Sequence, residues 1–372
     1  MSHSVEKIAL KSSSPGTQRF LKVHKFKAAK AGPKVYMQAA LHADEWPGLL
    51  TLQHLITQLI DLDKRDLLCG EIVIVPYANP IGMDQRLNGV VLGRHSFSAE
   101  GNFNRHWPDF STVTKEQLDK NPQSSVEQYR QALREAVALL PTHTPLAQLK
   151  ATLLALSIDA DIVLDLHCDS QALVHIYANY RQRDESELLA QCMRSPIVLL
   201  EDEPGGSPFD AAHILPWIAV ESSGCPVSCF TATVELRGFA DVDDQLAAAD
   251  AQGLLNFLAA SDVVQIAVTD MIETKVLTTD LEAVDSVRAT ATGILCWTKQ
   301  LGDWVEKGEL VAQVVRLESD TPEQGRTAIY SRTQGMLFTT NIGKLVCEGD
   351  NVGKIAGTQI LQNETGGGLL TL

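Results

Sequence analysis

Three segments decide the fold: KVYMQAAL (34–41), GLLTLQHLITQLIDL (48–62) and EIVIVPYA (71–78). The first and third are short, apolar and rich in β-branched residues, and both end at Gly, Pro or Asn signals, which predicts strands. The middle segment carries apolar residues at helical spacing. A strand–helix–strand unit favours a parallel crossover, so we expect an α/β fold.

The same alternation continues to about residue 260. Further strands are predicted at DIVLDLH (161–167), ALVHIYA (172–178) and SCFTATVELRG (228–238). Helices are predicted around residues 124–140, 145–157, 184–194 and 243–260. We therefore expect one domain over residues 1–265, with a mixed, largely parallel sheet flanked by helices.

The pattern changes near residues 262–280, after which helical periodicity vanishes. GILCWTKQLGDWVEKGELVAQV (293–314) and GMLFTTNIGKLVCEGDNVGKIAG (335–357) resemble each other, which indicates a duplication. We expect a small all-β domain over residues 280–372 that resembles the biotinyl/lipoyl barrel-sandwich fold. Domains of that type carry a modified Lys between the halves, whereas RLESDTPEQGRT (316–327) contains none. The domain is predicted to be structural or gating.

Composition excludes several classes of protein. The 372 residues carry a formal net charge of −15, which argues against nucleic-acid binding. No run reaches the roughly 20 apolar residues of a membrane span. The seven cysteines form no CxxC pair, so a disulfide framework is not expected. We expect a cytoplasmic protein with neither nucleic-acid nor membrane partners; a homo-oligomer is possible.

A metal site is predicted around the stretch AALHADEWPG (39–48). His42 and Glu45 stand three residues apart where a strand ends, and both residue types bind zinc. A surface His beside a helical Glu would give the same local pattern. His167 ends another predicted strand and is the candidate third ligand, because ligands of open α/β sheets bind beyond the strands' carboxyl ends. Asp165 lies two residues earlier and could support that imidazole.

A hydrolytic metal site also needs a base, and Glu235 in TATVELRG is the candidate. The alternative is a Glu that caps a helix or pairs with Arg237. The long segment 79–112 supplies three arginines, Arg86, Arg94 and Arg105, which are suited to clamping a carboxylate or stabilising an oxyanion.

The chain lacks H-E-x-x-H, G-x-S-x-G and G-x-x-x-x-G-K-[ST]. Instead, the ordered set HADE, NPIG, NFNR, DLH and TVELR resembles the succinylglutamate desuccinylase/aspartoacylase family, which is similar to the zinc carboxypeptidases. The resemblance covers roughly residues 30–260, and the appended β-domain resembles that of the bacterial deacylases. It implies that His42, Glu45 and His167 bind one Zn²⁺ per chain and that Glu235 is the general acid/base.

The resemblance also implies roles in substrate binding. Asn104 and Arg105 match the pair that holds the substrate carboxylate. Arg94 matches the arginine that polarises the scissile carbonyl, and Arg86 competes for that role. Asn102 replaces the acid of the usual DLNR pattern. A further substrate-reading Arg of aspartoacylases, upstream of the catalytic Glu, has no clear match, which leaves an acidic acyl group in doubt.

Together these features predict a zinc-dependent amidohydrolase that removes the acyl group from a small, carboxylate-bearing amide such as an N-acyl amino acid. Two alternatives remain open. A metallocarboxypeptidase acting on peptides would use nearly the same site chemistry, and a zinc-binding module without catalysis would use the ligands alone.

Overall fold

The computed structural model describes residues 2–98, 101–202, 205–269 and 275–361. Within them, the largest sheet has nine strands in the order β1-β2-β4-β3-β9-β13-β11-β12-β14. Their bounds are β1 (His3–Ala9), β2 (Phe20–Lys27), β3 (Lys34–Ala39), β4 (Glu71–Val75), β9 (Ile162–Asp169), β11 (His175–Asn179), β12 (Ile197–Glu201), β13 (Phe230–Gly238) and β14 (Leu277–Asp280).

The centre of this sheet is parallel. β4, β3, β9 and β13 run the same way, and so do β11, β12 and β14, whereas β11 is antiparallel to β13. The outer β1 and β2 add antiparallel pairs. This confirms the predicted mixed, largely parallel sheet. Its carboxyl-terminal strand ends at β3, β9 and β13 lie next to one another.

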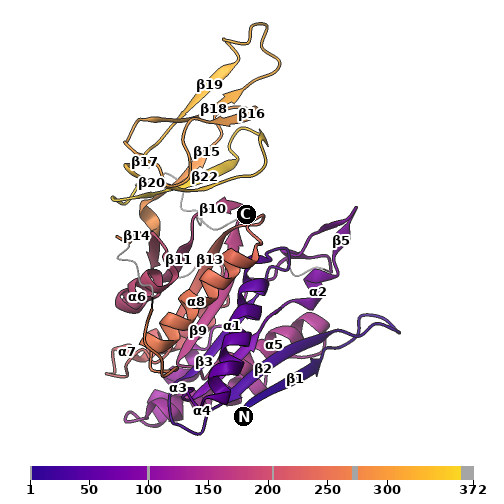
Figure 1. Ribbon diagram of the computed structural model, residues 1–372, viewed down its shortest axis with the longest axis vertical. Coiled ribbons are helices and arrows are strands. Elements are labelled where there is room, and N and C mark those ends of the chain that lie inside the picture. Colours follow the sequence, from indigo (N-terminus) through magenta and orange to yellow (C-terminus); the bar gives the residue numbers. More distant parts are fainter. Residues whose placement is uncertain (1, 99–100, 203–204, 270–274, 362–372) are drawn as a thin grey trace.

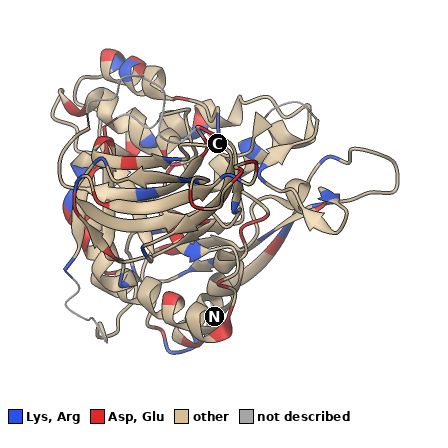
Figure 2. Cartoon of the chain, turned by 90° about the horizontal axis from the view of Figure 1, so that it is seen from above, with Lys and Arg blue, Asp and Glu red and all other residues tan. Residues whose placement is uncertain are grey.

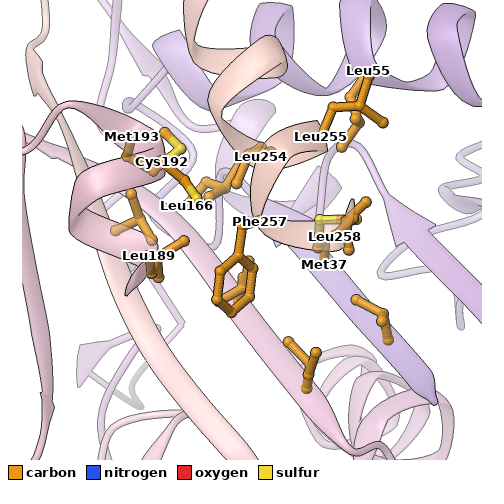
Figure 3. Close-up of a cluster of buried hydrophobic side chains, with 14 of the residues drawn as sticks. Met37, Leu55, Leu166, Leu189, Cys192, Met193, Leu254, Leu255, Phe257 and Leu258 are labelled. Carbon is orange, nitrogen blue, oxygen red and sulfur yellow. The ribbon is translucent and has the colours of Figure 1, made fainter. Parts of the chain in front are cut away.

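Helices cover both faces of the sheet. One face carries α1 (Pro47–Lys64), α6 (Arg183–Met193) and α8 (Asp244–Ala260); the other carries α3 (Ser111–Lys120), α4 (Val126–Ala138), α5 (Pro145–Ser157) and α7 (Ala211–Glu221). Figure 3 shows Leu254, Phe257 and Leu258 of α8 packing toward Leu166 of β9 and Met37 of β3. Burying such apolar side chains is the main stabilising contribution to a core of this kind.

Most predicted elements are present. The strand–helix–strand unit forms as β3, α1 and β4, and β3 pairs with β4 in parallel. The predicted helices form as α4, α5, α6 and α8. β1, β2, β12, α3 and α7 were not predicted. β1 is mostly exposed and carries charges, so it lacks the apolar alternation that marks a strand.

Segment 79–112 is less irregular than its composition suggested. It contains the short helix α2 (Pro80–Met83) and two small hairpins, β5 (Arg86–Leu87) with β6 (Val90–Val91) and β7 (His95–Ser96) with β8 (Gly101–Asn102).

Among the described residues, no helix combines the length and apolar character needed to cross a membrane. In Figure 2, acidic and basic residues are interspersed over the described part of the chain.

The carboxyl-terminal residues form two further sheets. One contains β10 (Gln171–Ala172), β20 (Gly335–Thr340), β22 (Asn351–Gly357) and β15 (Val284–Arg288), with β17 (Trp304–Val305) on β20. The other contains β19 (Arg326–Tyr330), β18 (Leu310–Val315), β16 (Gly293–Trp297) and β21 (Leu345–Val346). Both are open sheets, and the strands described here close no barrel. The two repeats exchange their short strands, because β17 of the first joins β20 of the second and β21 of the second joins β16 of the first.

A glycine begins each repeat for the same steric reason. A Cβ on Gly293 would lie 2.2 Å from the Val315 carbonyl oxygen, and a Cβ on Gly335 would lie 2.0 Å from that of Ala356. Both positions lie against the backbone of a neighbouring strand, so any side chain would force the strands apart. The shared requirement supports the predicted duplication.

The carboxyl-terminal sheets sit above the strand ends of the large sheet (Figure 1). β10 lies in the sequence between β9 and β11 of the large sheet, but it pairs with β20 of the carboxyl-terminal part. β14 lies at the predicted domain boundary, but it pairs with β12 and so belongs to the large sheet. A small apolar cluster spans the joint, including Tyr177 and Leu199 from one side and Phe338 from the other. The helix-bearing part and the β part therefore share one packed interface.

Candidate active site

A row of polar side chains lies on one face of the large sheet. Alternate residues of β9 and β13, such as Leu166 and Val234, pack into the core beneath α1, α6 and α8. Asp165, His167 and Glu235 therefore point to the opposite face. The register places Glu235 beside His167 on adjacent parallel strands. Strand alternation and register thus bring the predicted base and one predicted ligand together.

The turn that carries His42 and Glu45 is held at both ends. Ala40 adopts a left-handed backbone conformation with φ of 56°, which bends the chain out of β3. Asn79, from the NPIG motif, donates from Nδ2 to the Leu41 carbonyl at 2.8 Å. The Ala43 N–H donates to the carbonyl of Gly93 at 3.0 Å. These contacts explain how the loop after β4 fixes the turn after β3.

His42, Glu45 and His167 form one buried group. Each offers a ligand atom, and these atoms lie within 4.8 Å of one another. Nδ1 of His42 lies 2.9 Å from Oε1 of Glu45, and Nδ1 of His167 lies 2.8 Å from Oε2. The three side chains are 2–4% exposed, so solvent screens their interactions weakly.

The outer nitrogens of both imidazoles have polar partners. Nε2 of His167 donates to Oδ2 of Asp165 at 2.9 Å, and Nε2 of His42 donates to Oδ1 of Asn102 at 2.7 Å. Asp165 also accepts from Gln38 Nε2 at 3.1 Å. Donation from Nε2 leaves Nδ1 of a neutral ring with a lone pair directed at Glu45.

This donor set fits a zinc ion. The Nδ1 atoms of both imidazoles and the two oxygens of Glu45 converge on one point, where the Arg94 guanidinium also donates to Glu45, and such a convergence of ligand atoms suits a bound cation. Burial lowers the pKa of His42 to about 4, which favours the neutral form that a metal binds. Burial also acts to lower the pKa of His167, but Asp165 and Glu45 hold it well above its usual value, so a metal bound there would displace a proton from this ring. Burial opposes ionisation of Glu45, yet the His42 and His167 rings hold its pKa well below the usual value. Two nitrogens and one carboxylate leave the open position of a catalytic zinc site.

Glu235 lines the same cavity. Its Oε2 atom is buried without a hydrogen-bond partner among the described residues. Burial, followed by repulsion from Glu45, raises the pKa of Glu235 to about 8. The structure does not pair it with Arg237, which instead binds Asp250 on α8 at 3.0 Å. An unsatisfied carboxylate oxygen beside three metal-ligand side chains is placed to exchange a proton with a reacting group.

Arg94 and Arg86, both in the segment 79–112, lie in different environments. Arg94 reaches the cavity, where Nη1 donates to Glu45 Oε1 at 2.9 Å and lies 3.3 Å from His42 Nδ1. Arg86 lies on the exposed hairpin strand β5 and is not among the described residues that line the cavity. The structure thus brings Arg94, and not Arg86, to the site.

Asn104 and Arg105 also line the cavity. Asn104 accepts from the Phe209 N–H at 2.8 Å, which ties the loop to the segment before α7. Arg105 is part-buried, and burial lowers the pKa of its guanidinium. The carboxylates of Asp210 and Glu201 lie near Arg105. Burial, followed by repulsion from Asp210, raises the pKa of Glu201 to about 8, and burial, followed by Asp165, raises that of Asp210 to about 6.

The cavity has a volume of about 360 Å³. The carboxyl-terminal part supplies one of its walls, through Thr339, Thr340, Asn341, Ile342, Asn351 and Lys354. Lys354 is 18% exposed in its side chain, and its Nζ donates to Asp169 Oδ2 at 3.0 Å. A space of this size suits a small molecule.

Sequence reasoning missed Asp169, Glu201, Asp210 and Lys354. Asp169 follows His167 by two residues, so alternation along the strand could have placed it on the same face. Glu201 ends the apolar run IVLLE, the same signal that marked His167, but β12 itself was not recognised. No local signal in NVGKIAG marks Lys354, because its position depends on how the carboxyl-terminal sheets dock.

Most of this chain is similar to proteins of one known family. The model of the succinylglutamate desuccinylase/aspartoacylase catalytic domain matches residues 31–261. A curated N-alpha-acetyl-L-2,4-diaminobutyric acid deacetylase from Halomonas elongata is 25% identical over 335 residues, which cover 87% of this chain and 82% of that protein.

Solved structures share the whole architecture. A protein of the succinylglutamate desuccinylase/aspartoacylase family from Shewanella amazonensis superposes with a TM-score of 0.85 at 24% identity, covering 95% of this chain and 98% of that one. The product-bound ectoine utilization protein EutE (DoeB) from Ruegeria pomeroyi superposes with a TM-score of 0.64 at 21% identity, covering 96% and 95%. Because the family model spans more than half of the sequence and the three grouped side chains lie inside the match, this chain belongs to the succinylglutamate desuccinylase/aspartoacylase family of hydrolases.

Proposed function

We propose that this protein is a zinc-dependent deacylase that hydrolyses the amide bond of a small N-acyl amino acid. The observation that carries the proposal is the buried group of His42, Glu45 and His167, with Glu235, whose Oε2 has no hydrogen-bond partner among the described residues, in the same cavity. Family membership supports a hydrolase of this class.

The zinc ion would be held by His42, Glu45 and His167. When bound, it supplies a Lewis acid that polarises a carbonyl and lowers the pKa of a water molecule. In its ionised form, whose share grows as the pH rises toward the pKa of about 8, Glu235 takes a proton from the attacking water as the water oxygen bonds to the acyl carbon. The same carboxyl group then gives that proton to the amide nitrogen as the C–N bond breaks, so a carboxylic acid and an amine leave.

The remaining cavity residues bind and orient the substrate. Arg94 would stabilise the developing oxyanion, because its guanidinium reaches the cavity beside Glu45, where Nη1 donates to Oε1. Asn104 and Arg105 hold the substrate carboxylate, since a guanidinium matches that group geometrically. The carboxyl-terminal wall limits the length of substrate that can enter.

Glu235→Gln tests the mechanism. Gln keeps the shape of the side chain but cannot take the proton, so we expect turnover to fall by at least about 100-fold while bound zinc stays stoichiometric. Glu221→Gln is the matched control, because it removes a surface carboxylate that pairs with Arg181. Near-wild-type turnover by Glu235→Gln would remove Glu235 from the mechanism.

The carboxylates of Glu201, which is partly buried, and Asp210, which is buried, favour a substrate with a cationic side chain. Both line the cavity near Arg105, and an ammonium group would offset the repulsion between carboxylates that, after burial, raises their pKa values. The deacetylase from Halomonas acts on such a substrate, N-alpha-acetyl-L-2,4-diaminobutyric acid.

A substrate comparison tests this choice. We expect kcat/KM to be highest for N-acetyl-L-2,4-diaminobutyrate, lower for N-acetyl-L-2-aminobutyrate, which lacks the ammonium, and lowest for N-acetyl-L-aspartate. Equal values for all three would contradict a role for the two carboxylates. Faster cleavage of a tripeptide than of any N-acyl amino acid would favour the carboxypeptidase alternative, and a purified protein that holds stoichiometric metal but cleaves none of these compounds would favour the zinc-binding module without catalysis.

A further inference from the structure

The strand segment that follows His167 is held by the carboxyl-terminal part of the chain. Gln171 and Ala172 form β10, which pairs with Thr340 and Thr339 of β20. The Leu173 N–H donates to the Phe338 carbonyl at 2.9 Å.

Ser170 extends this attachment on the other side, since its Oγ accepts from the Ile342 N–H at 2.9 Å. Backbone contacts and one side-chain contact thus fix residues 170–173, which begin three positions after the predicted metal ligand His167.

Lys354 adds a charged contact to Asp169, two residues after His167. It lies on β22, and its Nζ reaches Asp169 Oδ2 at 3.0 Å across 185 positions of sequence. The side chains are 18% and 25% exposed, and both line the cavity. Tyr177 on β11 also hydrogen-bonds with this ammonium group. A largely buried ion pair fixes geometry more than it stabilises the fold, because desolvation offsets much of the attraction.

Asp169 occupies a position that couples β9 to β13. Glu235 pairs with His167, but the register then shifts, so that Gly238 pairs with Asp169. The shift coincides with Arg237, whose φ is 62°. The register shift in β13 therefore begins directly after Glu235 and ends at Gly238, the residue that pairs with Asp169. A contact that fixes the position of Asp169 therefore also fixes the backbone of β13 at Gly238, just beyond the cavity.

We propose that Lys354 is a positioning residue of the active site, which acts through Asp169 to fix the adjacent strand ends that carry His167 and Glu235. The proposal rests on the proposed deacylase function, and it makes the carboxyl-terminal part a component of the catalytic geometry in addition to a wall.

Kinetics of Lys354→Met test this role. Because a displacement of about 1 Å can cost about 100-fold in rate, we expect kcat for the best N-acyl amino acid to fall by about 10- to 100-fold, with KM changed by less than about threefold. Lys354→Arg keeps a cation at this place and is expected to restore most of kcat. Combining Lys354→Met with Asp169→Asn should lower kcat no further than the more severe single change, because both remove one interaction.

Lys299→Met is the matched control. Lys299 pairs with Glu309 within the same carboxyl-terminal part, and neither lines the cavity. We expect this variant to keep wild-type kcat even if it lowers Tm as much as Lys354→Met does. An unchanged kcat in Lys354→Met, or failure of Lys354→Arg to restore it, would overturn the proposal.

A readout independent of turnover separates the two proposals. The visible absorption spectrum of the Co²⁺-substituted protein reports the geometry around His167. We expect Lys354→Met to change this spectrum and Lys299→Met to leave it unaltered. A wild-type protein that binds Co²⁺ but cleaves no N-acyl amino acid would refute the proposed function alone, and identical Co²⁺ spectra for wild type and Lys354→Met would refute the positioning role.

Discussion

Replacing Asp165 by Asn should weaken metal binding without disrupting the hydrogen-bond network around it. Oδ2 of Asp165 accepts from His167 and Oδ1 accepts from Gln38, which in turn accepts from the Tyr36 hydroxyl at 2.7 Å. An Asn side chain has only one oxygen, which would keep the bond from His167. Its NH2 group would then face the NH2 group of Gln38, and two donors cannot bond to each other. Gln38 can turn over, offer its oxygen to the introduced amide and donate to the Tyr36 hydroxyl. The substitution therefore removes the charge and keeps the contacts.

The size of the effect follows from this geometry. Asp165 is 1% exposed, so the charge that supports His167 acts in a poorly screened environment. Loss of such an outer partner of a ligating histidine typically weakens metal affinity by about 10- to 100-fold. That range corresponds to about 1.4–2.7 kcal/mol of binding free energy.

Competition with a chromophoric chelator would measure the zinc Kd of wild type and variant at the same pH. Asp159→Asn is the matched control: Asp159 is a mostly buried carboxylate that precedes the same strand and pairs with Lys34 and Arg134 at the opposite end. We expect that control to lose stability and keep its zinc Kd. A zinc Kd within about twofold of wild type for Asp165→Asn would refute the assignment of Asp165 as the support of His167.

Three other predictions follow from the described contacts. Arg94→Ala should lower kcat by about 100- to 1,000-fold, measured by steady-state kinetics, if its guanidinium stabilises the oxyanion. Gly335→Ala should markedly lower Tm, because its Cβ would lie 2.0 Å from a carbonyl oxygen. Burial lowers the pKa of His213 to about 4, so its contribution to stability is complete above about pH 6.5 and is lost as the pH falls toward 4. Urea unfolding at pH 7 and pH 5 should show His213→Asn losing about 2 kcal/mol less than wild type over this interval.

The parts of the site that lie at recognisable strand ends could be predicted from sequence. His42 and His167 each follow an apolar run, and the carboxyl ends of neighbouring parallel strands meet at one edge of a sheet. Glu235 was found for the same reason. The order of β3, β9 and β13 in the sheet could not be read from the sequence, because it depends on the packing of helices against both faces.

Other parts depend on contacts between distant segments. Arg86 and Arg94 are both loop arginines, and only the hairpin β5–β6 turns the first of them outward. Lys354 reaches the cavity because β20 pairs with β10. A two-residue strand such as QA carries no pattern that predicts a partner as distant as Thr340, which lies 169 positions after Gln171. The exact bounds of the two predicted domains stay a prediction, since β10 and β14 lie across the division.

The joint between the two parts also constrains how the protein can be shortened. A chain that stopped at residue 265 would lack β14, leaving the backbone groups along β12 as an open strand edge, with Ile197 and Leu199 uncovered. Such an edge is a template for pairing with other chains, so we expect the truncated protein to aggregate instead of folding as an independent hydrolase. We therefore expect that the amino-terminal portion does not fold alone, although it holds every predicted metal ligand.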